Sequence, residues 1–233
     1  MSDFTIGVLG GMGTYATIHL FQQYAEIFPA EKEWERPRII IDNRCTMPSR
    51  VRAFIYHDKT DQLVNEMADS MKSLVEAGCT RIVLACNTSH LFLPRIYEYV
   101  PELEEKVLHI IENCVKEMKK EKIAKAFLLA SEGTIDSQIY QKALCAEDIE
   151  CVAPTKDEYP LLRECIEAVK QHTYSEKIKK NFLRLVNRYD TCILGCTELP
   201  VLYEKFHLEV TWGHVIDPLY MALKTLKKEY END

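Results

Sequence analysis

The chain has 233 residues, 47% of them hydrophobic and 28% charged, and a net charge of −7 at pH 7. This length can bury a large core, as one sizeable domain or two small ones, and the acidic balance argues against a general nucleic-acid-binding surface. The sequence shows no basic segment followed by an apolar one at its start and no apolar run of about 18 residues, so we expect no signal peptide, no membrane span and a cytoplasmic protein.

Strands and helices alternate through the first half of the sequence. Apolar runs predict strands, and apolar residues spaced three and four apart predict helices. The expected elements are a strand at 4–9, a helix from the following glycine turn to about 28, a strand at 38–41, a helix at 58–77 ending at Gly78, a strand at 82–85, and a helix at 102–119 around a short strand signal at 107–110.

The second half restarts the same order of elements. Its expected elements are a strand at 126–130, helices at 135–143, 159–170 and 175–187, a strand at 192–194, and a closing helix at 217–230. Helices that alternate with strands in this way predict parallel sheets.

Two internal matches connect the halves. Residues 8–14 align with residues 128–134 at an offset of 120, and residues 81–88 align with residues 191–198 at an offset of 110. We interpret the matches as a duplication, although any chain of alternating strands and helices yields some coincidences of this kind.

The duplication predicts the fold class and the domains. We expect an α/β protein of two similar, pseudo-symmetric domains, each with a parallel sheet of the four-stranded type, and an active site in the cleft between them. The first domain spans 1–100 and the second 101–216, and the C-terminal helix, 217–233, is expected to pack on the first domain.

The chain holds nine cysteines, and two of them occupy matched positions. The odd count and the lack of a C-x-x-C pair predict reduced thiols, and paired zinc-ligand spacings are missing, so we expect no metal site. Cys86 and Cys196 each stand just past a predicted strand and before polar residues, where a helix N-terminus can stabilise a thiolate. A single cysteine at such a position is usually a structural residue. The matched pair, however, predicts two proton carriers that face one substrate. We interpret the other seven as structural, with Cys45 the least secure because it lies beside a candidate binding loop.

Two further segments are candidates for anion binding. The turn Gly10-Gly11-Met12-Gly13 permits a close backbone approach by a phosphate or a carboxylate. It does not form G-x-G-x-x-G and has no P-loop lysine, which disfavours dinucleotide binding. The loop after the second strand holds Arg44 and Arg50, and arginine pairs bidentately with carboxylates. A solvated loop is the alternative for these arginines, and plain helix capping is the alternative for Thr134 in the matching turn.

Together these motifs resemble one family, the aspartate/glutamate racemases, which are cofactor-independent amino-acid racemases. The resemblance extends from residue 6 to about residue 222, and the glycine turn favours the aspartate branch. Thr14, Ser49 and Ser89 depart from the residues usual in the family. The segments that carry the resemblance are Gly7–Gly13 with Ala16 and Thr17, Met47–Arg50, Ala85–His90, Leu194–Pro200 and Ile216–Pro218.

The resemblance implies a two-base reaction without a cofactor. Cys86 and Cys196 would exchange the α-proton of a small dicarboxylic amino acid, aspartate or glutamate, from opposite faces, and Arg50 with Lys170 would hold the side-chain carboxylate. A homodimer is the expected assembly. The implied substrate-binding residues are Met12, Gly13, Asn43, Arg50, Asn87, Thr88, Thr134, Lys170, Thr197 and Glu198.

Two alternatives remain open at this point. One is another enzyme of the same superfamily, similar to maleate isomerases or decarboxylases, that uses a single cysteine. The other is a non-catalytic protein that binds amino acids or senses thiols. Exchange of the α-proton with solvent distinguishes the first alternative from a racemase, and turnover by the purified protein distinguishes the second.

Overall fold

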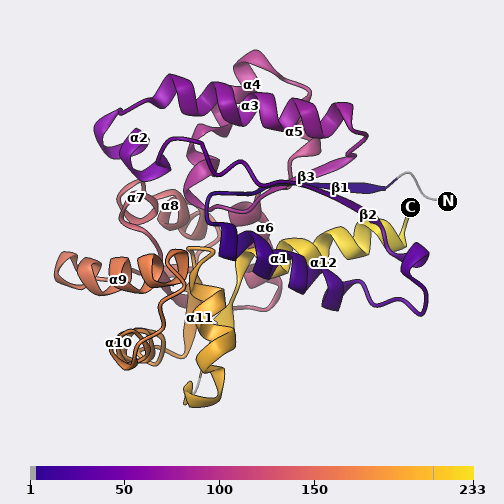
Figure 1. Cartoon of the computed structure of the whole chain (residues 1–233). Helices are drawn as coiled ribbons and strands as arrows, with labels where there is room; N and C mark the ends of the chain where they lie inside the picture. The colour runs from indigo at the N-terminus through magenta and orange to yellow at the C-terminus, as the bar shows by residue number, and fades with distance from the viewer. Residues whose placement is uncertain (1–3, 212) are drawn as a thin grey trace.

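The computed structural model describes residues 4–211 and 213–233 and contains two parallel β-sheets (Figure 1). The first sheet has the strand order β2-β1-β3, and the second has the order β5-β4-β6-β7. The strands are β1 (Thr5–Leu9), β2 (Arg38–Asp42), β3 (Arg81–Leu84), β4 (Lys125–Leu129), β5 (Glu150–Val152), β6 (Thr191–Leu194) and β7 (His214–Ile216). Residues 1–3 of the first predicted domain and residue 212 of the second lie outside this description.

Helices connect the strands and cover both sheets. The α-helices are α1 (Thr14–Ile27), α2 (Arg50–Tyr56), α3 (Thr60–Glu76), α4 (Leu93–Tyr99), α5 (Leu103–Lys106), α6 (Ile110–Lys120), α7 (Glu132–Asp136), α8 (Ile139–Cys145), α9 (Tyr159–Lys170), α10 (Glu176–Val186), α11 (Leu199–Phe206) and α12 (Pro218–Glu231). Short 3₁₀ turns lie at Glu33–Glu35, Thr88–Phe92, Lys156–Glu158 and His207–Glu209. Among the described residues, no helix is both long and apolar enough to cross a membrane.

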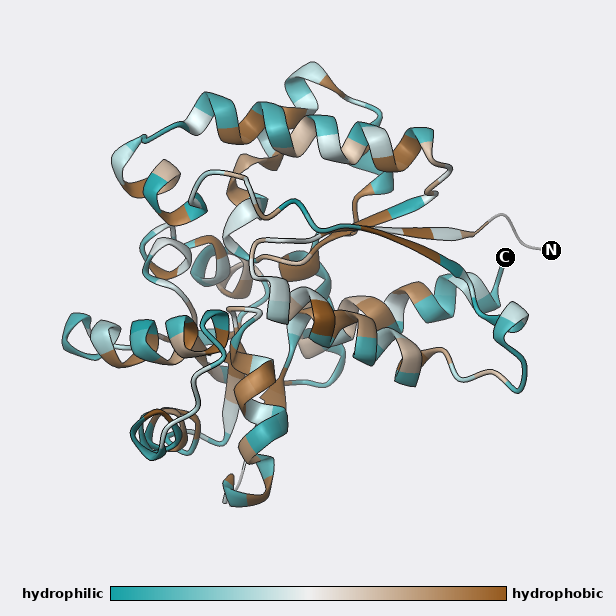
Figure 2. Cartoon of the chain, viewed as in Figure 1, coloured by the Kyte–Doolittle hydropathy of each residue, from teal (hydrophilic) through white to brown (hydrophobic). Residues whose placement is uncertain are grey.

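The two sheets share a hydrophobic core. Ile6 and Val8 on one face of β1 belong to the same buried cluster as Phe127 and Leu129 of β4. The other face of the first sheet packs under α3, which lies across it in Figure 1. Hydrophobic residues concentrate on the strands and on the helix faces turned toward them (Figure 2). The core joins the two sheets without an intervening linker, so the site between them has a rigid base.

The expected fold class is confirmed, and the internal matches fall on equivalent strands. The central strands β1 and β4 each pair in parallel with the strand that follows them and with the strand after that. Residues 8–14 and 128–134 cover the ends of β1 and β4, and residues 81–88 and 191–198 cover β3 and β6. Both matches therefore align the turns that leave the carboxyl ends of these strands.

The expectation of four strands in each sheet is wrong for the first sheet, which has three. The fourth position is reduced to one bridge between Ile82 and Val107, beside β3, where β7 stands beside β6 in the second sheet. Leu108 N–H donates to Ile82 O at 2.9 Å. This bridge also divides the helix predicted at 102–119 into α5 and α6, because an extended backbone interrupts helical hydrogen bonding.

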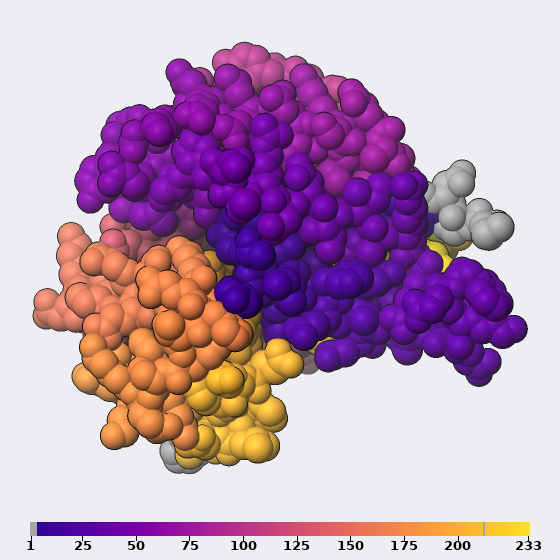
Figure 3. Space-filling view, viewed as in Figure 1, coloured from indigo at the N-terminus to yellow at the C-terminus, as the bar shows by residue number. Residues whose placement is uncertain are grey.

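The C-terminal helix α12 packs on α1 and on α6. Helix α1 belongs to the first predicted domain, as expected, but α6 belongs to the second. The domain boundaries at 100 and 216 stay a prediction. In the space-filling view the early residues, indigo and purple, meet the orange and yellow residues of the second sheet along a boundary across the visible face (Figure 3).

Candidate active site

Cys86 and Cys196 lie at equivalent strand ends and line one cavity. Cys86 follows β3, and Cys196 follows β6 and Gly195. The cavity that they share has a volume of about 60 Å³. Its lining residues are Met12, Ser49, Arg50, Val51, Cys86, Asn87, Thr88, Ser131, Ile166, Lys170, Gly195, Cys196, Thr197 and Glu198. Parallel strands end at the edge where α/β sheets bind ligands, which explains why these turns converge.

Hydrogen bonds between the two halves fix the cysteine turns against each other. Thr197 Oγ1 donates to Ala85 O, directly before Cys86, at 3.1 Å. Thr88 Oγ1 lies 2.8 Å from Thr134 Oγ1. All the residues in these contacts except Ala85 are polar yet buried, and buried polar groups that are paired hold a unique geometry. Two side chains of the second half, Thr197 and Thr134, therefore hold the turn that carries Cys86.

Cys196 is a protonated thiol at neutral pH. Its Sγ lies 2.9 Å from Oε2 of Glu198 and donates to it. Burial raises the pKa of Cys196 well above its ordinary value, and the negative charge of Glu198 and the hydrogen bond to it raise that pKa further. The positive charge of Lys170 opposes this effect. Glu198 is itself buried, so its charge acts through a medium that screens it weakly.

The turn that carries Cys86 is held from behind by two side chains. Ser89 Oγ donates to Cys86 O at 2.6 Å, and His90 Nδ1 lies 3.0 Å from the same oxygen. Burial, with His109 nearby, lowers the pKa of His90 to about 3, so the ring is neutral. Ile110 N–H donates to its Nε2 at 3.4 Å, which assigns the ring proton to Nδ1. Ser89 and His90 therefore shape the cysteine turn and do not line the cavity.

Arg50 and Lys170 bring positive charge to the cavity. Arg50 Nη1 and Nη2 donate to the backbone oxygens of Pro48 and Met12 at 3.0 and 2.9 Å, and its Nε has no partner. Lys170 Nζ donates to Glu167 Oε1 at 2.9 Å. Burial lowers the pKa of Lys170, but Glu198 and Glu167 raise it more, so its pKa is raised overall. Lys170 is thus cationic at neutral pH, and its ammonium and the Arg50 guanidinium can both attract a carboxylate.

Asn87 carries an unused hydrogen-bond donor beside Cys86. Its Oδ1 accepts from Tyr140 OH at 2.6 Å, which fixes the orientation of the amide. Its Nδ2 is buried and has no partner. A buried unpaired donor is costly, and Asn87 lines the cavity. The amide can therefore donate to an anionic group bound there.

The structure brings together most of the predicted binding residues. Seven of the ten line the cavity, namely Met12, Arg50, Asn87, Thr88, Lys170, Thr197 and Glu198. Gly13 lies behind it, since a Cβ at Gly13 would stand 2.5 Å from Glu198 Oε1. Thr134 lies beneath Thr88 as its hydrogen-bond partner.

Asn43 is placed elsewhere. It is exposed, its Nδ2 donates to Thr14 Oγ1 at 3.4 Å, and it does not line the cavity. Ser49, Val51, Ser131, Ile166 and Gly195 line the cavity but were not among the predicted binding residues. Within residues 4–211 and 213–233, no group of His, Cys, Asp and Glu side chains is suited to hold a metal ion.

The comparisons with known proteins agree on one family. The sequence model of the Asp/Glu/Hydantoin racemase family matches residues 9–226. A broad specificity amino-acid racemase of Bacillus subtilis is 27% identical over 214 residues, which are 88% of this chain and 90% of the relative. A glutamate racemase of Lactobacillus acidophilus is 28% identical over 176 residues, which are 70% of this chain and 62% of the relative.

Solved structures agree with the sequence comparisons. The aspartate racemase of Picrophilus torridus superposes with a TM-score of 0.81 at 25% identity and covers 98% of this chain and 94% of its own. An aspartate racemase homologue from Pyrococcus horikoshii shows the same fold, with a TM-score of 0.75 at 24% identity over 97% of this chain and 99% of its own. Because the family match spans nearly the whole chain, this protein belongs to the Asp/Glu/hydantoin racemase family and is an isomerase of the amino-acid racemase type.

Proposed function

We propose that this protein interconverts L- and D-aspartate without a cofactor, and that Cys86 and Cys196 exchange the α-proton. The observation that carries the proposal is the position of both thiols in the lining of one cavity. Two bases in one cavity can serve opposite faces of a carbon, whereas a single base would have to change faces.

The size of the cavity supports a small substrate. A buried water needs roughly 10–15 Å³ of such space, so the cavity of about 60 Å³ holds about four to six waters. A small amino acid is much closer to that size than a nucleotide is. The cations Arg50 and Lys170 line the same space, which suits an amino acid with two carboxylates.

The two thiols take opposite roles in each direction of the proposed reaction. In the proposed direction, the thiolate of Cys86 removes the α-proton while the thiol of Cys196 delivers its proton to the opposite face, which leaves Cys86 as the thiol and Cys196 as the thiolate. Glu198 holds the proton on Cys196 beforehand. The negative charge that develops on the substrate α-carboxylate is met by the free Asn87 Nδ2 donor.

The experiment that tests the proposal uses the purified protein with L-aspartate in D₂O and no added cofactor. We expect D-aspartate to form, as followed by circular dichroism, with deuterium incorporated at the α-carbon. Because the Bacillus subtilis relative is named for broad specificity, glutamate and alanine belong in the same assay. Exchange without formation of the other enantiomer would favour a one-cysteine enzyme.

A matched control is available in Cys45. It is an exposed free cysteine and does not line the cavity, so Cys45→Ser should racemise aspartate at the wild-type rate. Any loss caused by replacing Cys86 or Cys196 can then be assigned to position and not to the removal of a thiol in general.

A further inference from the structure

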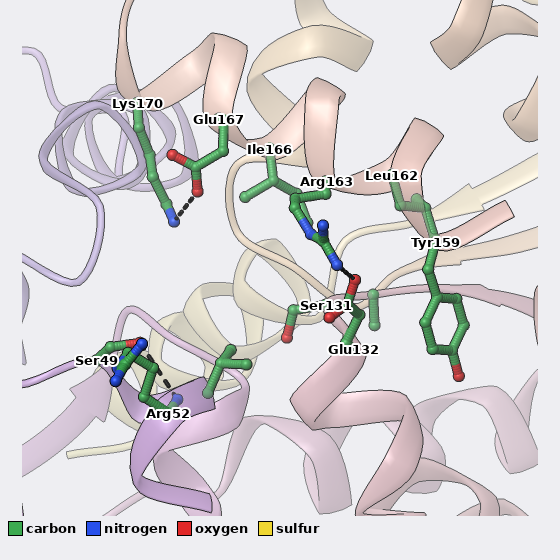
Figure 4. A pocket seen from close by; sticks show the side chains of 12 residues that line it. Ser49, Arg52, Ser131, Glu132, Tyr159, Leu162, Arg163, Ile166, Glu167 and Lys170 are labelled. Carbon is green, nitrogen blue, oxygen red and sulfur yellow. Dashed lines mark hydrogen bonds and ion pairs between the residues drawn. The ribbon is translucent and has the colours of Figure 1, made fainter. Parts of the chain in front are cut away.

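A second, larger cavity opens beside the cysteine cavity. It has a volume of about 220 Å³ and lies between the start of α2, the turn from β4 to α7, and one face of α9 (Figure 4). We call it the outer cavity, and the cysteine cavity the inner one. The two share part of their lining, namely Ser49, Val51, Ser131, Ile166 and Lys170. A group that leaves the inner cavity between these residues therefore enters the outer one.

The outer cavity is much larger than aspartate needs. At roughly 10–15 Å³ for each water, it holds about fifteen to twenty-two waters. The outer cavity thus offers space for a side chain several atoms longer than that of aspartate.

Part of the wall of the outer cavity is apolar. Leu162 and Ile166 project from α9, and Val51 and Ala130 line the cavity from the other elements. Three of these residues are buried in the hydrophobic core and Val51 is partly buried. This lining favours methylene groups, because burying them removes apolar surface from water.

The charged residues of the outer cavity already have partners. Arg163 pairs with Glu132, and Lys170 pairs with Glu167 at 2.9 Å, as the dashed lines in Figure 4 show. Arg52 pairs with Asp58 at 2.9 Å. A charged side chain that entered would compete with these pairs, whereas a neutral side chain would not.

Arg50 tolerates a substrate without a side-chain carboxylate. An unpaired buried guanidinium would strongly reject neutral amino acids. Here, however, the Nη atoms of Arg50 already donate to Pro48 O and Met12 O. A neutral substrate leaves these two bonds intact, and of the guanidinium nitrogens only Nε lacks a partner, so the loss of a side-chain carboxylate costs less here than beside a guanidinium with no partners.

We infer that the outer cavity receives long neutral side chains, and that the enzyme also racemises unbranched, methylene-rich amino acids such as norleucine and methionine. This inference rests on the proposed racemase chemistry of the inner cavity. The reacting carbon stays between the two thiols, and the side chain extends past Val51 and Ile166 onto Leu162.

The test compares norleucine with lysine, which has the same chain length plus an ammonium group. We expect norleucine to be racemised, with a kcat/KM about two- to fivefold above that of lysine, the factor that breaking one exposed ion pair represents. A kcat/KM for lysine tenfold above that for norleucine would contradict the inference that the outer cavity receives neutral side chains. Racemisation of aspartate but not of norleucine would overturn the inference and leave the proposed function standing; turnover of no amino acid would overturn both.

A matched pair of variants tests the location. Leu162 lines only the outer cavity, and its neighbour Leu161 lines neither. Leu162→Phe should lower kcat/KM for norleucine about tenfold or more, as expected from losing room for one or two methylenes, and leave aspartate within about twofold. Leu161→Phe should change neither. Equal losses for both substrates in Leu162→Phe, with an unchanged melting temperature, would show that the outer cavity does not hold the side chain.

Bulk at Leu162 can also disturb the fold, because this residue is buried. Tyr159→Trp gives a second measurement at a partly exposed position that lines only the outer cavity. It should reduce norleucine turnover relative to aspartate turnover in the same direction as Leu162→Phe. An unchanged ratio in both folded variants would contradict the inference.

Discussion

The contact between Cys196 and Glu198 sets the resting state of the site. Two residues apart in sequence, they share a proton at 2.9 Å inside the protein. The negative Glu198 carboxylate raises the pKa of the thiol because a thiolate beside it would be repelled. The same contact keeps one proton ready for delivery, which a two-base reaction needs in the resting enzyme.

Glu198→Gln should lower the pKa of Cys196 relative to the wild type. The sign follows from the removal of a negative charge that disfavours the thiolate, although burial still keeps the pKa above the ordinary value. The measurement is the pH dependence of alkylation of Cys196 by iodoacetamide, followed by mass spectrometry. An alkylation profile that does not move toward lower pH would contradict the role given to Glu198.

Arg50→Ala should weaken aspartate turnover more than alanine turnover. A hydrogen bond to a charged group contributes about 1.5–3 kcal/mol, which corresponds to a loss of about ten- to 150-fold in kcat/KM for aspartate. Alanine lacks the side-chain carboxylate. Its kcat/KM should fall only as far as the loss of the hydrogen bond from Arg50 to Met12 O disturbs the turn at Met12. If aspartate kinetics were unchanged, Lys170 would replace Arg50 as the carboxylate ligand.

At the scale of elements, strand ends and helix starts carry the site, and helix α9 adds one wall. Helix α1 begins after Gly13, whose backbone is extended with φ −171° and therefore unstrained. Gly13 is required for space alone, because a Cβ would meet the Glu198 carboxylate. Gly78, at the end of α3, is required for its backbone conformation and not for space. Its φ is +94°, and no atom lies within 4 Å of an added Cβ.

The two glycines allow stability and activity to be separated. Gly13→Ala should lower kcat strongly by displacing Glu198, with a melting temperature near that of the wild type. Gly78→Ala should destabilise the fold by about 1 kcal/mol through its positive φ and leave kcat unchanged. Thermal unfolding and aspartate racemisation on both variants measure this, and loss of activity in Gly78→Ala alone would refute the assignment.

The same scale shows what the sequence could predict. Long apolar runs predicted β1, β3, β4 and β6, because a buried parallel strand needs such a run. Strands β5 and β7 have three residues each, too short for any periodic signal. The Ser131–Thr134 turn and the short helix α2 are fixed by contacts between α2 and α7, which no local pattern contains.

For the whole molecule, the duplicated order of strands brings two distant cysteines into one cavity. The pairing of Cys86 with Cys196 could be predicted from the 110-residue offset between them, because β3 and β6 are equivalent strands. The sequence could not predict that Ile166 lines the cavity, because its position in the pattern is the same as that of a core residue of an amphipathic helix. The family resemblance implied Asn43 as a substrate-binding residue, but it follows β2, which is an edge strand, and Asn43 is exposed. The homodimer and the cytoplasmic location stay predictions, and light scattering would measure the first.

The central claim is that both thiols act, and racemisation by the two serine variants tests it most directly. General acid–base groups contribute about 10²–10⁴-fold, so Cys86→Ser and Cys196→Ser should each lose at least about a hundredfold in aspartate racemisation in D₂O, while Cys45→Ser keeps the wild-type rate. Each single variant should keep α-proton exchange on suitable substrate analogues of one configuration, and the two variants should prefer opposite enantiomers. If either variant racemises at the wild-type rate while the other is inactive, the enzyme uses one thiol and the two-base account is wrong.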